Sequence, residues 1–180
     1  VVPNDVTGLK LVPSGSTSVK LSWDKLANTG YAIYYSVDGE TWTYVARTTG
    51  TSYTHSGLKS NRGYYYRVRA YQLVSKEYVY GEYSEVETVV TGPAIPKLSV
   101  VTTANKSLNV IFGEVAGATT YEIYRMAAGE KAYTHIVTLG EAGTYEDKDL
   151  IVGKTYYYKV RARNEEGIVG TFSTYVAGIV

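Results

Sequence analysis

A nine-residue pattern occurs twice in this chain, and it constrains the fold more than any other feature. Residues 63–71 read GYYYRVRAY, and residues 155–163 read TYYYKVRAR. Aligning these stretches also brings SVKLSWDKLANTGYAIYYS, residues 18–36, into register with SLNVIFGEVAGATTYEIYR, residues 107–125. So many matched positions in the same order indicate a tandem duplication, and a chain of 180 residues is long enough for two domains.

Both repeats read as short strands separated by turn residues, and neither shows a helical period. In the first repeat we expect strands at Gly8–Val12, Ser18–Trp23, Tyr31–Ser36, Trp42–Thr48, Ser52–His55, Gly63–Val74 and Tyr78–Thr91. In the second we expect them at Lys97–Thr102, Leu108–Gly113, Tyr121–Met126, Tyr133–Leu139, Gly143–Glu146, Thr155–Asn164 and Thr171–Gly178. About seven short strands in roughly 90 residues are typical of an immunoglobulin-like β-sandwich.

The predicted fold class is therefore all-β, with two consecutive seven-stranded sandwiches in domains 1–91 and 92–180. The boundary lies in TGPAIP, residues 91–96. So short a connection with two prolines leaves little slack for independent tumbling. We expect the two sandwiches to be arranged end to end.

Alternation along the repeated strand separates a core face from an outer face. The predicted inward side chains are Tyr64, Tyr66, Val68 and Ala70 in the first repeat, and Tyr156, Tyr158, Val160 and Ala162 in the second. The predicted outward ones are Tyr65, Arg67 and Arg69, and Tyr157, Lys159 and Arg161. Tyr64 and Tyr156 each follow a leucine by six residues, which predicts a tyrosine corner whose hydroxyl bonds to the upstream backbone.

Each repeat resembles a fibronectin type III domain. The resemblance is carried by Trp23 (Phe112 in the second repeat), by YAIYY and YEIYR, by the leucine before each corner, and by YYYRVRA and YYYKVRA. NEEGIVGTFS, residues 164–173, is also similar to the family's stretch between its sixth and seventh strands. The many tyrosines and the segment VSKEYVYGEYS, residues 74–84, resemble modules of large surface or secreted proteins of Gram-positive bacteria.

Composition narrows the possible partners and compartments. The formal net charge is +1, which gives no electrostatic argument for nucleic acid or an anionic membrane. No apolar run approaches ~20 residues, so we expect no direct membrane insertion. The absence of cysteine excludes a disulfide framework and thiolate chemistry. The start lacks the regions of a signal peptide, and we expect the chain to be part of a longer protein.

No constellation of residues predicts catalysis, a metal or a cofactor. His55 and His135 do not fall on equivalent positions, and no nucleophile elbow or phosphate loop is present. We expect structural histidines. The acidic run EDKD, residues 146–149, could supply oxygen ligands for calcium, but its sister THSG lacks them, so a solvated turn is favoured. Glu165 and Glu166 are neighbours in a loop and do not make an acid/base pair. NKS, residues 105–107, is a glycosylation sequon of use only in a eukaryotic host.

Two surfaces are candidate binding sites. The connection Tyr71–Ser84 is longer than its counterpart, and it predicts a projecting hairpin with a turn near Ser75–Glu77. Its candidate ligand-binding residues are Tyr71, Tyr78 and Tyr80. The second surface is an outward stripe of Tyr34, Tyr65 and Arg67, matched by Tyr124, Tyr157 and Lys159. Each surface also has a structural alternative. The hairpin could pack on the preceding domain of the intact protein or on its own sandwich, and the stripe could consist of cross-strand pairs that stabilise an exposed sheet face.

The leading hypothesis is a non-catalytic spacer or presentation scaffold in an extracellular, secreted or surface-attached bacterial multidomain protein. Its partners would be other domains of the same polypeptide. The alternative is an adhesin-like module that binds a protein or glycan ligand through the hairpin or the exposed Tyr/Arg face. An enzyme is the third hypothesis and is not favoured, because no polar site converges.

Overall fold

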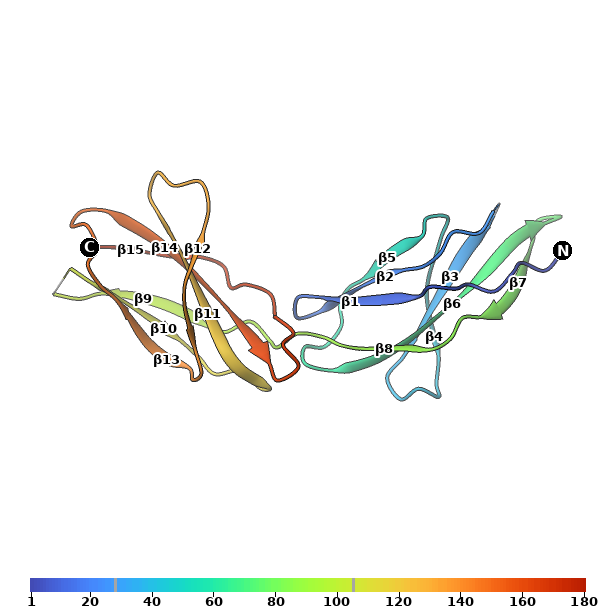
Figure 1. Cartoon of the computed structure of the whole chain (residues 1–180), viewed down its shortest axis with the longest axis horizontal. Helices are drawn as coiled ribbons and strands as arrows, with labels where there is room; N and C mark the ends of the chain where they lie inside the picture. The colour runs from blue at the N-terminus through green and yellow to red at the C-terminus, as the bar shows by residue number, and fades with distance from the viewer. Residues whose placement is uncertain (28, 105) are drawn as a thin grey trace. The chain divides into compact units, whose positions relative to one another are not determined.

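The computed structural model describes residues 1–27, 29–104 and 106–180. The chain divides into two compact units, Val1–Thr91 (unit 1) and Gly92–Val180 (unit 2). The described residues contain strands, turns and loops and no helix, and each unit is built from two sheets (Figure 1). The all-β prediction is therefore confirmed.

Unit 1 contains β1 to β8. Their bounds are β1 Lys10–Ser14, β2 Ser18–Ser22, β3 Gly30–Ser36, β4 Thr43–Thr48, β5 Ser52–His55, β6 Gly63–Val74, β7 Glu77–Tyr83 and β8 Glu87–Val90. One sheet has the order β1-β2-β5. The other has the order β4-β3-β6-β7, and β8 also pairs with β6.

Unit 2 repeats this plan with β9 to β15. Their bounds are β9 Leu98–Thr102, β10 Leu108–Phe112, β11 Ala118–Ala127, β12 Thr134–Leu139, β13 Gly143–Asp147, β14 Thr155–Asn164 and β15 Val176–Ile179. Its sheets have the orders β13-β10-β9 and β12-β11-β14-β15. In both units the third sandwich strand carries a register shift at the same place, between Ile33 and Tyr34 and between Ile123 and Tyr124.

Each unit has its own hydrophobic core between its two sheets. All eight side chains predicted to point inward along the repeated strand are buried. Trp23 packs on Tyr31 with ring centroids 5.3 Å apart, and in unit 2 Phe112 packs on Tyr121 at 5.2 Å. Phenylalanine therefore fills the tryptophan site without loss of the aromatic contact.

The predicted tyrosine corners are confirmed. The hydroxyl of Tyr64 accepts a hydrogen bond from the backbone N–H of Lys59 at 2.8 Å, and that of Tyr156 accepts one from Ile151 at 3.1 Å. The hydroxyl of each corner tyrosine, Tyr64 or Tyr156, thus pairs with a loop N–H, which would otherwise lack a hydrogen-bond partner. These corners hold the crossover between the two sheets.

The strand predicted at Tyr78–Thr91 is wrong as a single element, because it divides into β7 and β8. The cause is a serine at the break. The hydroxyl of Ser84 accepts a hydrogen bond from the N–H of Val68 at 3.0 Å, in place of a backbone carbonyl. Unit 2 has the same device, since the hydroxyl of Ser173 accepts from Val160 at 3.0 Å. A side-chain hydroxyl that takes the place of a backbone acceptor interrupts the regular pairing of the strands and bends the chain.

Most of the other strand bounds agree with the sequence prediction or differ from it by a single residue, and three strands differ by more. β11 begins at Ala118, three residues before the predicted Tyr121. The first strand begins at Lys10 rather than at Gly8, because Gly8 has φ +67°, outside the extended region. The last strand covers Val176–Ile179 instead of Thr171–Gly178. Before it the chain bonds to β14 only at isolated points such as the Arg163–Val169 bridge.

Candidate ligand-binding surface

The outer face of the β4-β3-β6-β7 sheet carries arginines layered between aromatic rings. The guanidinium of Arg67 lies 4.2 Å from the ring centroid of Trp42 and 3.6 Å from that of Tyr83. Arg69 lies 4.7 Å from Tyr83 and donates a hydrogen bond to the hydroxyl of Tyr34 at 2.8 Å. We call these five residues the aromatic–cation ladder. Its arginines are half-buried, so the face predicted to be open to solvent is largely covered by its own side chains.

Unit 2 carries an equivalent ladder. Lys159 lies 4.4 Å from the ring of Tyr133 and 4.1 Å from that of Phe172. Arg161 lies 4.6 Å from Phe172 and donates to the hydroxyl of Tyr124 at 3.2 Å. Because both units use the same layering, its shared role is to cover and stiffen the sheet.

A second cluster is present in unit 1 and has no equivalent among the described residues of unit 2. The guanidinium of Arg47, on β4, lies 3.9 Å over the ring of Tyr78 and 5.6–5.8 Å from the rings of Tyr44, Tyr71 and Tyr80. Its Nε donates to the hydroxyl of Tyr80 at 3.1 Å, and its Nη2 donates to the same oxygen. These five residues are named the Arg47 patch. The hydrogen bonds that Arg47 donates to Tyr80 raise the pKa of Arg47, so this group is fully charged.

The strand registers show why unit 2 lacks such a cluster. Arg47 pairs with Ala32 in the first unit, and the corresponding pair in the second is Thr138 with Glu122. His135 takes the place of Tyr44, since each pairs with the third-strand tyrosine. Unit 2 also has no counterpart of the β6–β7 hairpin, which supplies three of the four tyrosines.

The hairpin is built as the sequence predicts. β6 ends at Val74 and β7 begins at Glu77, which leaves a two-residue turn. Both turn residues, Ser75 and Lys76, have positive φ angles, of 52° and 70°, as a turn that matches the twist of the strands requires. The register places Tyr71 opposite Tyr80, so both rings stand on the face that also carries Arg47.

Counter-ions distinguish the two units. In unit 2 the buried Glu122 accepts hydrogen bonds from Arg161 and Arg163, each at 2.6 Å. Burial alone would raise the pKa of Glu122, but the two arginines outweigh it and the pKa is lowered. Ala32 occupies the equivalent position in unit 1.

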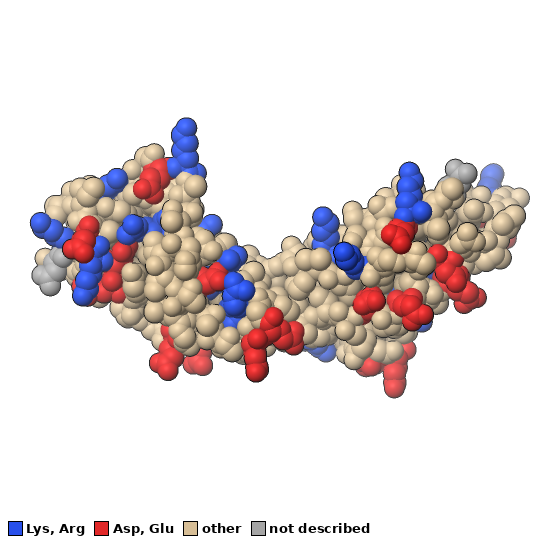
Figure 2. Space-filling view, viewed as in Figure 1, with Lys and Arg blue, Asp and Glu red and all other residues tan. Residues whose placement is uncertain are grey.

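The four ion pairs found among the described residues all belong to unit 2. Figure 2 shows acidic and basic side chains interspersed over the visible face of both units. The Nε atoms of Arg67 and Arg69 are buried and have no hydrogen-bond partner. Unit 1 therefore carries arginines that no carboxylate of its described part neutralises.

Five of the six residues predicted as a binding surface fall into two groups. Tyr34 and Arg67 belong to the aromatic–cation ladder. Tyr71, Tyr78 and Tyr80 come together in the Arg47 patch. Tyr65 stands apart from both groups and lies against the β3–β4 turn, where a Cβ added to Gly39 would lie 3.4 Å from its ring.

Sequence reasoning missed four contributors to this face: Trp42, Tyr44, Arg47 and Tyr83. Period-two alternation along the predicted strand Trp42–Thr48 would have placed Trp42 and Tyr44 on one face. The β-bulge then shifts the register so that Arg47 also reaches the hairpin, and that shift has no clear sequence signal.

The other candidate residues are structural where they are described. His55 Nδ1 lies 2.8 Å from the hydroxyl of Tyr66, and His135 Nε2 lies 2.9 Å from the Thr138 hydroxyl. Glu165 and Glu166 are exposed in the β14–β15 connection. Asn105 of the sequon lies outside the described residues.

The solvated turn expected at residues 146–149 is wrong for one of its acids. Asp147 is the last residue of β13 and is only 4% exposed, because alternation along the strand points it inward. It accepts hydrogen bonds from Arg125 at 3.0 Å and from the hydroxyl of Tyr158 at 2.6 Å. Glu146 faces outward and pairs with Lys148 at 3.1 Å. The segment is thus a structural ion-pair site.

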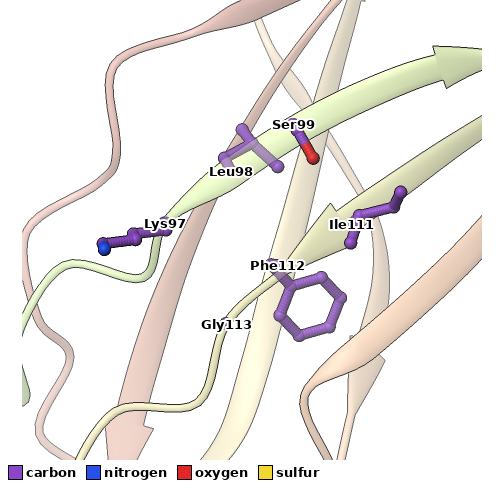
Figure 3. Close-up of a pocket in the computed structure, with 6 residues that line it drawn as sticks. All are labelled: Lys97, Leu98, Ser99, Ile111, Phe112 and Gly113. Atoms are coloured by element: carbon purple, nitrogen blue, oxygen red, sulfur yellow. The ribbon is translucent and has the colours of Figure 1, made fainter.

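One hollow of unit 2 is lined mainly by apolar side chains. A pocket of about 230 Å³ lies between the ends of β9 and β10, where Leu98, Ile111 and Phe112 supply apolar walls (Figure 3). Lys97 is the one ionisable residue among its lining. Within the described ranges no group of three or more His, Cys, Asp or Glu side chains is placed to hold a metal. The same residues include no helix long and apolar enough to cross a membrane.

Comparison with known proteins assigns this architecture. The family model of the fibronectin type III domain matches residues 4–89. Residues 4–89 are a fibronectin type III domain. The crystal structure of the chicken CNTN1 FN1–FN3 domains superposes on this chain with a TM-score of 0.55 at 20% identity. The superposition covers 100% of this chain and 68% of the CNTN1 chain. This likeness extends the fibronectin type III fold to unit 2.

Two curated relatives are bacterial glycoside hydrolases. Exoglucanase B of Cellulomonas fimi is 27% identical over 190 residues, which cover 97% of this chain and 16% of that protein. Amylopullulanase of Thermoanaerobacterium saccharolyticum is 31% identical over 77 residues, which cover 43% of this chain and 6% of that protein. The chain therefore resembles fibronectin type III modules that form small parts of multidomain enzymes, and this module type is non-catalytic.

Proposed function

We propose that this pair of fibronectin type III units is a non-catalytic spacer that separates or presents other domains of an extracellular bacterial multidomain protein. The observation that carries the proposal is the path of the chain through each unit. In unit 1 the chain enters at one end of the sandwich and leaves at the other, and the same is true of unit 2 (Figure 1). The chain runs along the length of each sandwich an odd number of times, since β7 and β8 together count as one pass. It therefore begins and finishes at opposite ends of the unit. Each unit therefore holds its two ends apart.

The side-chain chemistry supports a structural role. The arginines of the outer sheet faces stack on aromatic rings, and the buried carboxylates Glu122 and Asp147 are bonded to arginines. The relatives also contain such modules as a minor part of their length.

Single-molecule energy transfer tests the spacer. The chain has no cysteine, so cysteines introduced at Val2 and at Ile95, in the connection just after unit 1, are the only sites for a dye pair that spans unit 1. We expect a narrow distribution of transfer efficiency that stays constant until denaturant unfolds the unit. A Gly/Ser linker of equal length is the control, and it follows random-coil statistics with a broad distribution. An equally broad distribution for the folded chain, or hydrolysis of any member of a glycan or peptide panel, would overturn the proposal.

A second candidate function is a binding module, and the unit-specific Arg47 patch favours it. Tyr78 and Tyr44 are 47% and 48% exposed, and Leu73 on the same hairpin is also exposed. Tyrosine-rich surfaces on a rigid sandwich suit recognition of a protein or a glycan. Replacing Tyr78 and Tyr80 by serine is expected to abolish any affinity found in a ligand screen. Unchanged affinity would remove the hairpin from consideration.

A further inference from the structure

We propose that the Arg47 patch of unit 1 binds a polysaccharide that carries carboxylate groups. The inference rests on the second of the two functions above, and it names the ligand class. Three properties of the patch support it: a cation without a counter-ion, exposed aromatic rings beside that cation, and the lack of an equivalent of Arg47 at the matching position, Thr138, of the sister unit.

The cation is Arg47. Its Nε and Nη2 atoms bond to the hydroxyl of Tyr80, whereas no hydrogen bond of Nη1 to a described residue is found. No described carboxylate lies within 4.0 Å of its guanidinium. The side chain is exposed, yet four tyrosine rings hold its position. A fixed guanidinium with free donors matches a carboxylate, which accepts two parallel hydrogen bonds from it.

The neighbouring ladder strengthens this attraction. Arg67 and Arg69 add two positive charges to the same sheet face, and Ala32 stands where unit 2 places the neutralising Glu122. No described carboxylate lies within 4.0 Å of the guanidinium groups of Arg47, Arg67 and Arg69, so these cations remain able to attract an anion. Charge complementarity selects an anionic ligand over a neutral one.

The aromatic rings indicate that the anion is borne by a sugar. Tyr78 stands nearly perpendicular to Tyr71, at 83° with centroids 5.1 Å apart, and nearly parallel to Tyr80, at 29°. Such an array offers apolar ring surface together with phenolic hydroxyls, which suits the apolar faces and hydroxyl groups of sugar rings. Nucleic acid is disfavoured, because its affinity depends on many phosphate contacts, whereas the patch has a single exposed guanidinium.

Affinity electrophoresis of the full chain tests the inference. The probes are polygalacturonate, whose sugars carry carboxylates, and the same polymer after chemical reduction of its carboxyl groups to alcohols. We expect retardation by polygalacturonate and little or none by the reduced polymer. A single-stranded oligonucleotide and vesicles of anionic lipid are the competing polyanions, and we expect weaker binding to both.

Three variants locate the site. Arg47→Gln is expected to weaken binding about tenfold, the loss typical of a hydrogen bond to a charged group. Tyr78→Ser removes the exposed ring and is expected to weaken binding to a similar degree. Lys20→Gln is the matched control, because it removes one exposed positive charge from the opposite sheet of the same unit, and its binding is expected to be unchanged. Tryptophan fluorescence checks that each variant is folded.

The outcomes separate the inference from the function on which it rests. Equal retardation by both polymers would overturn the carboxylate class and leave the binding function standing. Retardation by neither polymer, equal binding of the competing polyanions, or full affinity in Arg47→Gln would overturn the inference.

Discussion

At the scale of residues, one pair of equivalent buried tyrosines shows how the duplicated core has diverged. Tyr66 and Tyr158 occupy the same place on the repeated strand, and burial is the main cause that raises the pKa of both hydroxyls. In unit 1 the hydroxyl meets His55. In unit 2 it meets Asp147, which also binds Arg125. The same polar need is therefore satisfied by a neutral partner in one core and by an ion pair in the other.

Replacing Asp147 by Asn is expected to destabilise unit 2 by about 2 kcal/mol, because it leaves the guanidinium of Arg125 without its charge partner. The effect is smaller than for a fully buried pair, since the Arg125 side chain is 32% exposed. Both tryptophans, Trp23 and Trp42, lie in unit 1. Denaturant unfolding followed by tyrosine circular dichroism should therefore shift, and unfolding followed by tryptophan fluorescence should not. A shift of both signals, or of neither, would contradict this assignment.

Unit 1 is expected to lose stability as the pH falls from about 7.5 to about 5.5. Burial lowers the pKa of His55 in the folded state below its ordinary value of about 6.5. Between these two pKa values the unfolded chain binds more protons, so acidification favours unfolding. Tryptophan fluorescence measured against denaturant at several pH values tests this. The variant His55→Gln should lose the pH dependence in that window, and retention of the dependence would assign it to other groups.

At the scale of elements, the β6–β7 hairpin is the main difference between the two sandwiches. Its strands continue past the sheet, and its turn places non-glycine residues at positive φ. Left-handed backbone costs an ordinary residue about 1 kcal/mol or more. The hairpin therefore retains some strain at its tip, and its tyrosines are held by cross-strand pairs and by Arg47 rather than by the core.

The substitution Lys76→Gly is expected to stabilise the hairpin by about 1 kcal/mol, because glycine adopts the positive φ of 70° without a Cβ clash. Amide hydrogen exchange at Val74 and Glu77 should slow as a result. The variant Lys76→Val is the contrasting control, since a β-branched residue is poorly suited to this region, and exchange should become faster. The same exchange rates in both variants would show that the turn carries no strain.

At the scale of the whole molecule, the chain is two separate cores joined at Thr91–Gly92. The buried residues form two clusters, one confined to each unit. The buried Glu122 of unit 2 forms its ion pairs with two arginines of the same unit. Neither sandwich therefore needs the other to complete its interior.

Each unit is expected to fold when produced alone, as residues 1–91 or 92–180, because a domain with its own core is thermodynamically self-sufficient. Cooperative thermal unfolding of each fragment, measured by circular dichroism, tests this. The tryptophan signal of the 1–91 fragment provides an independent readout for unit 1. A fragment that lacks a cooperative transition would show that its core depends on the other unit.

The sequence alone determined the class of fold and most of the strands. The reason is local, because period-two alternation shows which side chains are inward, and the repeat confirms the reading at Tyr64 and Tyr156. The hairpin turn was also predictable, since a two-residue connection lies between alternating tyrosines. The fate of each outward side chain was harder to predict, because it depends on the neighbouring strands.

Only the tertiary structure decided which surface residues act together. Arg47 is 31 residues from Tyr78 in the chain, and β3 and β6 lie between their strands in the sheet. Its guanidinium still contacts that ring, because a bulge shifts the register of β4 and turns Arg47 to the outer face. Asp147 was expected in solvent and is buried, because β13 extends to it. Alternation assigns a face to a residue, whereas partners and counter-ions are set by strand order and register, which are long-range properties of the folded chain.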